Sequence, residues 1–337
     1  MPGGSLLRRN YRGKRVRFLR SRLMISADLG EIDNRETAMF DRALEKAVKR
    51  FQKRHGLRVD GMAGAKTLKA LNVTIEERIN QIKANMERLR WIPNNFGRRY
   101  VLVNIASFSL HTIDNKEKVL SMRVVVGKKS RGTPVFKSRI THVELNPYWN
   151  IPPKIASEDI LPKILKDADY LSKERIKVYE GWGKNAPEID PELIKWSKLS
   201  SQYFPYKLRQ EPGSKNALGR IKFFFPNKFD VYLHDTPARG LFNEIKRDFS
   251  SGCIRIEKPI ELAGYLLNGD PRWTREKIPE IINEGKNQMI WVTKPIDIYM
   301  LYLTAWIDEE GILNFRDDIY GRDVALQIAL KQRPPSY

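Results

Sequence analysis

The sequence predicts an α+β protein in which a small all-α N-terminal domain precedes a mainly β domain that carries a helical insertion. Apolar residues recur at helical spacing up to residue 91, and strand-like alternation begins at Tyr100. Helical segments then interrupt this alternation between about residues 154 and 218. A chain of 337 residues, 41% of them apolar, is long enough for two or three domains with substantial cores.

The first domain is expected within residues 11–73 and contains three helices. The apolar residues at helical spacing on the first two helices are Val16, Leu19, Leu23, Leu44, Val48 and Phe51. Gly56 ends the second helix, and an Asp60-Gly61 turn leads into a third helix that closes near Asn72. His55, in the last turn of the second helix, is expected to serve there as a favourable charge or a hydrogen-bond donor.

A longer helix is predicted over residues 74–91, within a linking segment that spans residues 74–98. Thr74 and Glu77 form a capping box, and Pro93 stops the helix. One face of this helix is apolar and is expected to pack against a core; it comprises Ile75, Ile79, Ile82, Met86 and Leu89. Trp91 is also expected to lie in a core.

The β domain is expected over residues 99–303, followed by a C-terminal scaffold segment over residues 304–337. The predicted strands lie within residues 100–110, 118–128, 138–145, 222–225, 229–234, 288–295 and 296–308. Asp190 is the expected N-cap of a helix in the insertion, and another helix is expected through residues 261–267. His111 and His142 lie in or beside strands and are expected to be structural.

The composition excludes several classes of function. One cysteine and four scattered histidines make a protein metal site improbable, and no cofactor is expected. No apolar run is long enough to cross a bilayer, and no apolar segment follows the basic N-terminus as in a signal peptide. The net charge of +21 favours an anionic partner, but the basic residues are spread along the chain without a nucleic-acid-binding signature.

The single cysteine, Cys253, lies in the stretch DFSSGCIRIEK. An isolated cysteine is most often a buried, inert residue. Here it follows Gly252, which allows backbone N–H groups to approach a bound carbonyl closely. A nucleophilic cysteine needs a base or a positive neighbour, and His234 and Arg255 are the candidates.

Two segments resemble known families. The segment AVKRFQKRHGLRVDGMAGAKTLKALN resembles the peptidoglycan-binding type 1 module. The segment HDTPARGLFNEIKRDFSSGCIRI, with fifteen residues between His234 and Ser250, resembles the signature of the YkuD-type L,D-transpeptidases. Ser251 stands where that signature has a second histidine, and no catalytic task is assigned to it. This substitution and the segments NPYWNIPP, PGSKNALGRIKFFFPN and YLHDTP together resemble the YcbB-like branch of the family. That branch has a capping subdomain over the active site.

This resemblance implies a YkuD-like β sandwich and cysteine acyl transfer between peptidoglycan stem peptides, forming 3→3 cross-links. It implies Cys253 as nucleophile, His234 as base, and Gly252 and Tyr232 as contributors to an oxyanion site. The residues that it implies for substrate binding are Arg255, Trp149, Tyr148 and Ser250, and for Trp149 and Tyr148 a role as core aromatics stays open. It further implies an exported, periplasmic or cell-envelope location, and carbapenem-type β-lactams as covalent inhibitors.

Several alternatives stay open from the sequence. Transfer to water would make the protein an L,D-carboxypeptidase, and transfer to a lipoprotein lysine would make it an anchoring enzyme. For Arg255, orienting a substrate carboxylate and holding the loop are equally compatible with the sequence. A non-catalytic cell-wall binding protein and a nucleic-acid-binding protein are the rival classes.

Overall fold

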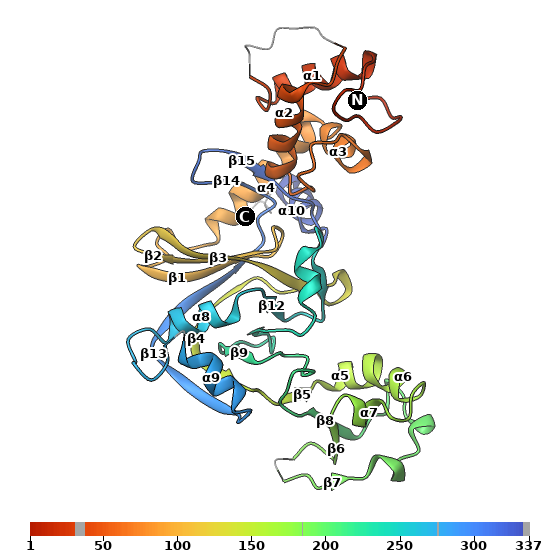
Figure 1. Ribbon diagram of the computed structural model, residues 1–337, viewed down its shortest axis with the longest axis vertical. Coiled ribbons are helices and arrows are strands. Elements are labelled where there is room, and N and C mark those ends of the chain that lie inside the picture. The colour runs from red at the N-terminus through yellow and green to blue at the C-terminus, as the bar shows by residue number, and fades with distance from the viewer. Residues whose placement is uncertain (31–37, 184, 275, 333–337) are drawn as a thin grey trace. The chain divides into compact units, whose positions relative to one another are not determined.

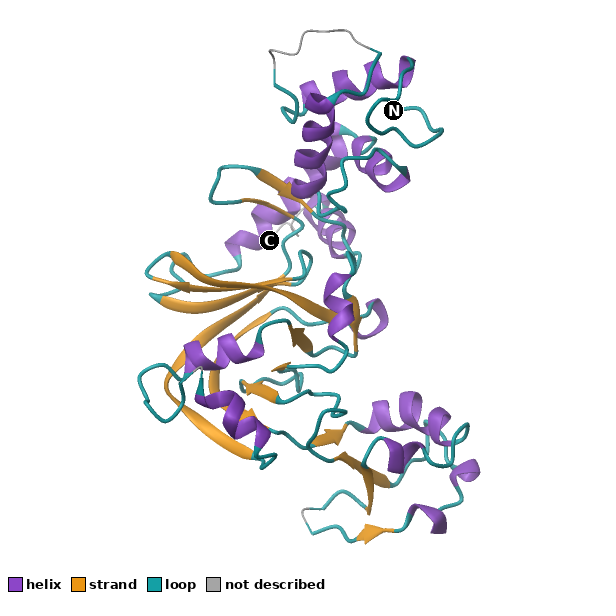
Figure 2. Ribbon diagram, viewed as in Figure 1, coloured by secondary structure: helices purple, strands orange, loops and turns teal. Residues whose placement is uncertain are grey.

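The computed structural model describes residues 1–30, 38–183, 185–274 and 276–332, which divide into two compact units (Figures 1 and 2). One unit comprises Met1–Asn95 with Tyr302–Tyr337, and the other comprises Phe96–Leu301. Among the described residues, no helix combines the length and apolar character needed to span a membrane. The fold class predicted from the sequence is confirmed.

The first unit is mainly helical. Its elements are α1 (Lys14–Ile25), α2 (Arg42–Arg54), α3 (Ala65–Leu71), α4 (Ile75–Arg90), the hairpin of β14 (Ala305–Ile307) and β15 (Leu313–Phe315), and α10 (Arg322–Lys331). The predicted core positions of the first two helices are buried in one cluster, which also receives Phe40 and Leu71. The three predicted N-terminal helices are therefore confirmed.

His55 closes α2 as a neutral donor. Its Nδ1 lies 2.8 Å from the carbonyl oxygen of Phe51, which can only accept a hydrogen bond. Burial, helped by the nearby charges of Arg54 and Arg78, lowers the pKa of His55 to about 2. The expectation of a hydrogen-bond donor is confirmed, whereas a favourable charge at this helix end is wrong.

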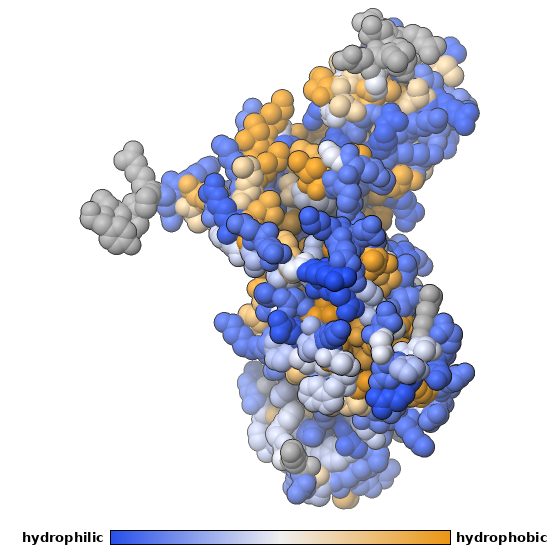
Figure 3. Space-filling model, turned by 90° about the vertical axis from the view of Figure 1, so that its left-hand side faces the viewer, coloured by the Kyte–Doolittle hydropathy of each residue, from blue (hydrophilic) through white to orange (hydrophobic). Residues whose placement is uncertain are grey.

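Helix α4 begins with the predicted capping box. The Thr74 Oγ1 accepts from the Glu77 N–H at 3.1 Å, and a Glu77 carboxylate oxygen accepts from the Thr74 N–H at 2.8 Å. The predicted burial of its apolar face is wrong, because Ile75, Met86 and Leu89 are exposed. Trp91, also expected in a core, is 63% exposed. Hydrophobic atoms are visible at several places on the surface, among the hydrophilic ones (Figure 3).

The buried face of α4 is polar because its hydrogen-bond partners come from the C-terminal segment. The Gln81 side-chain amide donates to the carbonyls of Thr304 and Arg316, at 3.1 and 2.9 Å. The Asn85 side chain exchanges two hydrogen bonds with Thr304, at 2.7 and 2.9 Å. Helical periodicity identifies an apolar stripe, but it cannot anticipate partners that lie more than 200 residues away in the sequence.

An ion pair between Arg88 and Asp323 completes this polar face, and both side chains are more than 90% buried. Breaking a buried pair leaves an uncompensated charge, so we expect Arg88→Ala to cost about 3–5 kcal/mol of unfolding free energy. Arg90→Ala is the matched control, because Arg90 is 73% exposed in its pair with Glu87 and should cost no more than about 1 kcal/mol. Urea denaturation followed by far-UV circular dichroism measures both, and equal losses would contradict the prediction.

The second unit is built on a nine-stranded sheet with the order β11-β3-β12-β10-β9-β4-β13-β1-β2. Its strands are β1 (Arg99–Asn104), β2 (Ser109–Asp114), β3 (Glu117–Gly127), β4 (Phe136–Leu145), β9 (Ile221–Phe224), β10 (Leu233–His234), β11 (Asp248–Ser250), β12 (Ile254–Ile256) and β13 (Gln288–Leu301). An additional β2–β3 pairing closes this sheet on itself. Two helices follow β12 in the chain, α8 (Pro259–Leu266) and α9 (Lys277–Asn283).

Most predicted strands and the helix through residues 261–267 are confirmed, with three changes of extent. The strand expected over residues 100–110 ends at Asn104, and β2 begins at Ser109 after a turn. The segments expected over residues 288–295 and 296–308 form one long strand up to Leu301, β13, whose register shifts between Trp291 and Ile296, and the remainder contributes β14. Only Leu233 and His234 of the segment 229–234 pair as strand, because Asp230 has a φ of 52° and the Asn227 side chain binds the turn.

An insertion lobe (residues 149–210) leaves the sheet after β4 and returns to it at β9. It has its own four-stranded sheet, β5-β8-β6-β7, and its own buried apolar cluster. Its elements are β5 (Trp149–Ile151), α5 (Pro153–Ile155), a π-helical turn (Ala156–Ile160), α6 (Leu161–Ile164), α7 (Tyr170–Lys173), β6 (Ile176–Glu180), β7 (Glu188–Ile189) and β8 (Tyr206–Gln210). Asp190 is an N-cap as predicted, but it starts a short 3₁₀ turn instead of an α-helix.

Candidate active site

The Cys253 loop (residues 250–253) connects β11 to β12. Gly252 has a φ of 122°, a conformation that other residues rarely adopt. Cys253 is half-buried, and its sulfur lies 3.8 Å from the carbonyl oxygen of Asp230. The loop therefore presents the thiol at the beginning of β12 and near the turn that leads into β10.

Strand register brings the predicted catalytic residues together. β10 and β12 are parallel neighbours in which His234 is opposite Arg255. The Ile254 N–H donates to the Tyr232 carbonyl at 3.1 Å, so the pairing extends toward Cys253. Because strand side chains alternate between faces, Tyr232 and His234 share a face with Cys253 and Arg255. The Tyr232 and His234 rings meet edge to face, with centroids 5.7 Å apart.

The imidazole of His234 is held neutral. Its side chain is buried, and burial together with the charge of Arg255 lowers the pKa of His234 to about 3. Its Nδ1 lies 2.5 Å from the Asp235 carbonyl oxygen, which can only accept, so Nδ1 carries the ring proton. The other ring nitrogen therefore carries no proton.

The Cys253 thiol is also neutral at rest. Burial raises the pKa of Cys253, an effect that hydrogen bonds from the Tyr232 backbone and side chain partly offset. Burial and the facing sulfur raise the pKa of Tyr232 well above its usual range, so its hydroxyl stays a donor. The resting pair is therefore a thiol and a neutral imidazole.

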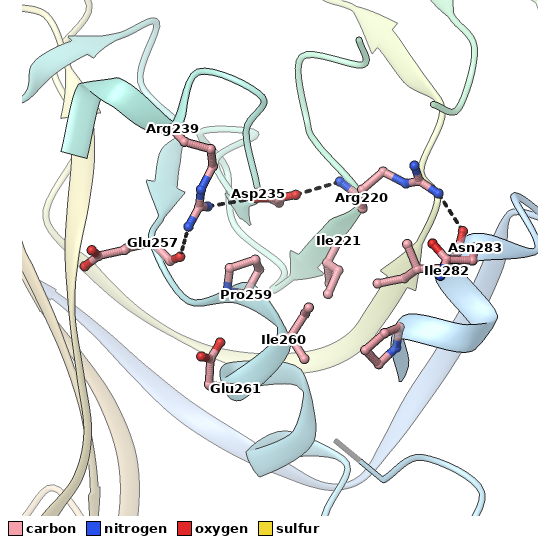
Figure 4. A pocket seen from close by; sticks show the side chains of 11 residues that line it. Arg220, Ile221, Asp235, Arg239, Glu257, Pro259, Ile260, Glu261, Ile282 and Asn283 are labelled. Carbon is pink, nitrogen blue, oxygen red and sulfur yellow. Dashed lines mark hydrogen bonds and ion pairs between the residues drawn. The ribbon is translucent and has the colours of Figure 1, made fainter. Parts of the chain in front are cut away.

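Asp235, the residue after the histidine, lies between Arg220 and Arg239 (Figure 4). The Asp235 carboxylate accepts from the Arg220 backbone N–H at 2.9 Å and from the Arg239 guanidinium at 3.2 Å. These residues line a pocket of about 460 Å³ together with Glu257 and Ile260. The Asp235 N–H donates to the Ile221 carbonyl at 2.8 Å, so the residue whose carbonyl accepts from His234 is held through its side chain and its backbone N–H.

A row of charged side chains crosses the sheet at the level of His234. Glu144, Lys222, His234 and Arg255 are successive cross-strand partners on β4, β9, β10 and β12. Lys222 forms a 3.7 Å ion pair with Glu144 and lies 4.5 Å from the Tyr232 ring centroid. The imidazole is thus flanked by two cations, which oppose its protonation.

Within the described part of the chain, the Arg255 side chain has an unsatisfied hydrogen-bond donor. Its buried Nε has no hydrogen-bond partner among the described residues, and burial lowers its pKa. An incoming carboxylate would satisfy this donor, so the arrangement suits an anionic ligand group. Among the described residues there is no cluster of three histidine, cysteine or carboxylate side chains suited to hold a metal ion.

Two predicted site residues are engaged within the Cys253 loop. The Ser250 hydroxyl is buried; it donates to the Cys253 carbonyl at 2.5 Å and accepts from the Gly252 N–H at 3.2 Å. The Gly252 N–H, expected to face an oxyanion, is therefore occupied in this conformation. The roles assigned from the sequence to Ser250 and Gly252 stay predictions.

The predicted aromatic residues lie at the start of the insertion lobe and are half-buried. Trp149 is the first residue of β5. A hydrogen bond from its indole N–H to the Tyr232 hydroxyl partly offsets the rise in the pKa of Tyr232. Tyr148 stacks under the Arg209 guanidinium, 4.7 Å from the ring centroid. Trp149 thus joins the lobe to the face that carries Cys253.

Sequence reasoning missed Lys222, Glu144 and the supporting Asp235. Lys222 interrupts the apolar strand RIKFFF at a position that alternation assigns to the face opposite Ile221 and Phe223. A charge inside an apolar strand was the available signal. The carbonyl of Asp235 left no signal, because any residue type supplies one.

Comparison with known proteins identifies the family of the chain. Residues 98–275 match the L,D-transpeptidase catalytic domain family (YkuD), and residues 12–71 match the family described as "Putative peptidoglycan binding domain". A Haemophilus influenzae protein described as "Putative L,D-transpeptidase" is 36% identical over 263 residues, which cover 78% of this chain. The chain belongs to the L,D-transpeptidase family.

Its members are acyltransferases. The chain spans about half of the curated relative, since the match covers 51% of that protein. Similar solved structures include an L,D-transpeptidase from Stackebrandtia nassauensis, with 13% identity, a TM-score of 0.31, and coverage of 88% of this chain and 94% of that one. L,D-transpeptidase 3 from Mycobacterium tuberculosis, in complex with a faropenem-derived adduct, has 11% identity, a TM-score of 0.27 and 60% coverage of both chains. At these TM-scores the assignment depends on the sequence matches.

Proposed function

We propose that this L,D-transpeptidase forms 3→3 cross-links in peptidoglycan by cysteine acyl transfer. The observation that carries the proposal is the placement of Cys253, Tyr232 and neutral His234 on one face of adjacent parallel strands. A thiol beside an unprotonated imidazole is the arrangement that nucleophilic catalysis by cysteine requires.

In the first half-reaction, the Cys253 sulfur attacks the carbonyl at the L-centre of the third residue of a donor tetrapeptide. The thiol proton passes to the unprotonated nitrogen of His234 as the carbon–sulfur bond forms. Collapse of the tetrahedral intermediate breaks the peptide bond, and the departing D-alanine amine takes the proton from His234. A thioester on Cys253 results.

In the second half-reaction, the side-chain amine of a neighbouring stem attacks this thioester. His234 accepts a proton from the amine and returns it to the departing sulfur, so the thiol is regenerated. One peptide bond replaces another, and the exchange needs no activated donor, metal or cofactor.

The oxyanion of each tetrahedral intermediate would be stabilised by the Tyr232 hydroxyl and the Cys253 backbone N–H. The raised pKa of Tyr232 keeps its hydroxyl protonated, and so able to donate, over the physiological range. Arg255 would bind a substrate carboxylate through its unsatisfied Nε. Trp149 and Tyr148 would form one wall of the substrate site.

The charge of the chain fits a polymer rich in carboxylates. A net charge of +21 would concentrate the protein on peptidoglycan without sequence-specific contacts. We further propose a location in the cell envelope, with stem peptides as donor and acceptor and with carbapenems as covalent inhibitors of Cys253. The match of residues 12–71 to a peptidoglycan-binding family supports the same partner.

Two assays on the purified chain test this function. Incubation with a disaccharide-tetrapeptide should give 3→3 dimers and free D-alanine, and incubation with imipenem should add one drug mass to the protein. Tripeptide without dimers would show L,D-carboxypeptidase activity instead. A chain that binds peptidoglycan but forms neither product nor adduct would be a non-catalytic cell-wall protein.

A further inference from the structure

A turn at the end of β3, residues 127–133, encloses the Cys253 loop. The Lys128 N–H donates to the Ser250 carbonyl at 2.8 Å, and the Thr133 hydroxyl donates to the Gly252 carbonyl at 2.8 Å. Between these two contacts, the Arg131 guanidinium donates to the Ser251 hydroxyl at 2.9 Å. Each of the three residues that precede Cys253 is therefore bound by this one turn.

The same guanidinium also binds the insertion lobe. Arg131 forms ion pairs with Glu158 and Asp159, and its side chain is only 12% exposed. A hydrogen bond with Asp159 raises the pKa of Arg131, so the side chain is charged at every pH at which the protein is folded. A single planar cation thus joins the lobe to the residue two positions before the cysteine.

Glu158 and Asp159 lie in a π-helical turn. Ala156–Ile160 forms a π-helical turn in which the Leu161 N–H reaches back to the Ala156 carbonyl. Pro162 follows, and it has no N–H to close the ordinary helical bond to Glu158. Such turns occur often at functional sites, and this one carries both partners of Arg131.

We propose that Arg131 is a positioning residue for Cys253, which couples the acidic pair of the insertion lobe to the Cys253 loop. The Ser251 hydroxyl accepts a hydrogen bond from this guanidinium. Gly252, the next residue, leaves the adjoining backbone intrinsically flexible. Arg131 adds the restraint that ties this loop to the insertion lobe and so aims the sulfur at a substrate carbonyl. The inference depends on the proposed function only in taking Cys253 as the nucleophile.

The test compares two reactions of the same thiol. Acylation by imipenem requires an aligned attack on a carbonyl, whereas alkylation by iodoacetamide mainly reports exposure and thiolate content. We expect Arg131→Gln to lower the maximal acylation rate constant about 10- to 100-fold with little change in half-saturating imipenem concentration. Alkylation should stay within about threefold of wild type, and Arg131→Lys should recover part of the acylation rate.

Two further variants make the result decisive. Glu158→Gln combined with Asp159→Asn keeps Arg131 but removes its ion pairs with the lobe, and should lower acylation about tenfold. Arg139→Gln removes a matched arginine that pairs with Asp297 on β13 and is 62% exposed, and should leave both reactions unchanged.

An acylation rate constant for Arg131→Gln equal to that of wild type would overturn the proposal. If Arg131→Gln does not fold, the same result in the double variant would overturn it. A parallel loss of acylation and alkylation would also overturn it, because that pattern indicates general loss of structure. A wild-type protein that forms no imipenem adduct would instead contradict the proposed function.

Discussion

Replacing Cys253 with alanine is expected to abolish cross-linking and imipenem adduct formation, lowering the transfer rate by roughly 10⁴-fold or more. The chain has no second cysteine to take over, and the Tyr232 hydroxyl, whose pKa is raised by burial, stays a protonated donor that cannot replace the thiol as nucleophile. Muropeptide analysis and intact-mass measurement on the same preparations would show the loss.

Cys253→Ser provides the companion variant. It keeps the size and the hydrogen-bonding capacity of the side chain, so the Cys253 loop should retain its conformation and the thermal unfolding midpoint should hardly change. A hydroxyl is a far weaker nucleophile than a thiol at neutral pH, so activity should be lost as in the alanine variant. Cross-linking that survives in both variants would require a different nucleophile and would end the proposed mechanism.

Replacing His234 with glutamine is expected to lower the acylation rate constant about 10²- to 10⁴-fold. The variant keeps a polar side chain of similar length but offers no base for the thiol proton. His111→Gln is the matched control, since His111 lies on β2 and bonds the Ser121 hydroxyl across to β3. Single-turnover acylation by imipenem compares the two, and similar losses would argue against His234 as the base.

The pH dependence follows from the sign of the shift at His234. An ordinary imidazole, with a pKa of about 6.5, would lose its base form as the pH falls through that value. Burial and Arg255 lower the pKa of His234 to about 3, so its base form persists well below pH 6.5. We expect the imipenem acylation rate constant at pH 5 to remain close to its value at pH 7.

The free energy of unfolding, unlike the acylation rate, is expected to fall as the pH is lowered, so it must be measured at each pH. The unfolded chain binds a proton at this histidine below about pH 6.5, whereas the folded protein does so only near pH 3. Acid therefore favours unfolding progressively between these values, and circular dichroism should confirm that the protein is folded at each pH. A loss of acylation centred near pH 6.5 in folded protein would contradict the neutral-imidazole mechanism.

Helix α4 shows where pattern reasoning fails. Its capping box depends on residues three apart, so the sequence predicts it correctly. Which face of the helix is buried depends on Thr304 and Asp323, which reach it from the far end of the chain. Ion pairs and hydrogen bonds to these residues stabilise burial of the polar face, although the apolar stripe has the stronger helical periodicity.

The sequence by itself determined the candidate nucleophile and its base, because a single cysteine after Ser-Ser-Gly and a histidine at fixed spacing are local, readable features. It also determined the change from helical to strand periodicity, since each pattern reports which side of an element faces a core. Only the tertiary structure decided the protonation and orientation of these groups. Burial, the cations of Lys222 and Arg255, and the Asp235 carbonyl fix the imidazole, and Arg131 ties the Cys253 loop to the insertion lobe. These partners meet through strand register and chain crossings, which arise from long-range pairing and leave no periodic trace in the sequence.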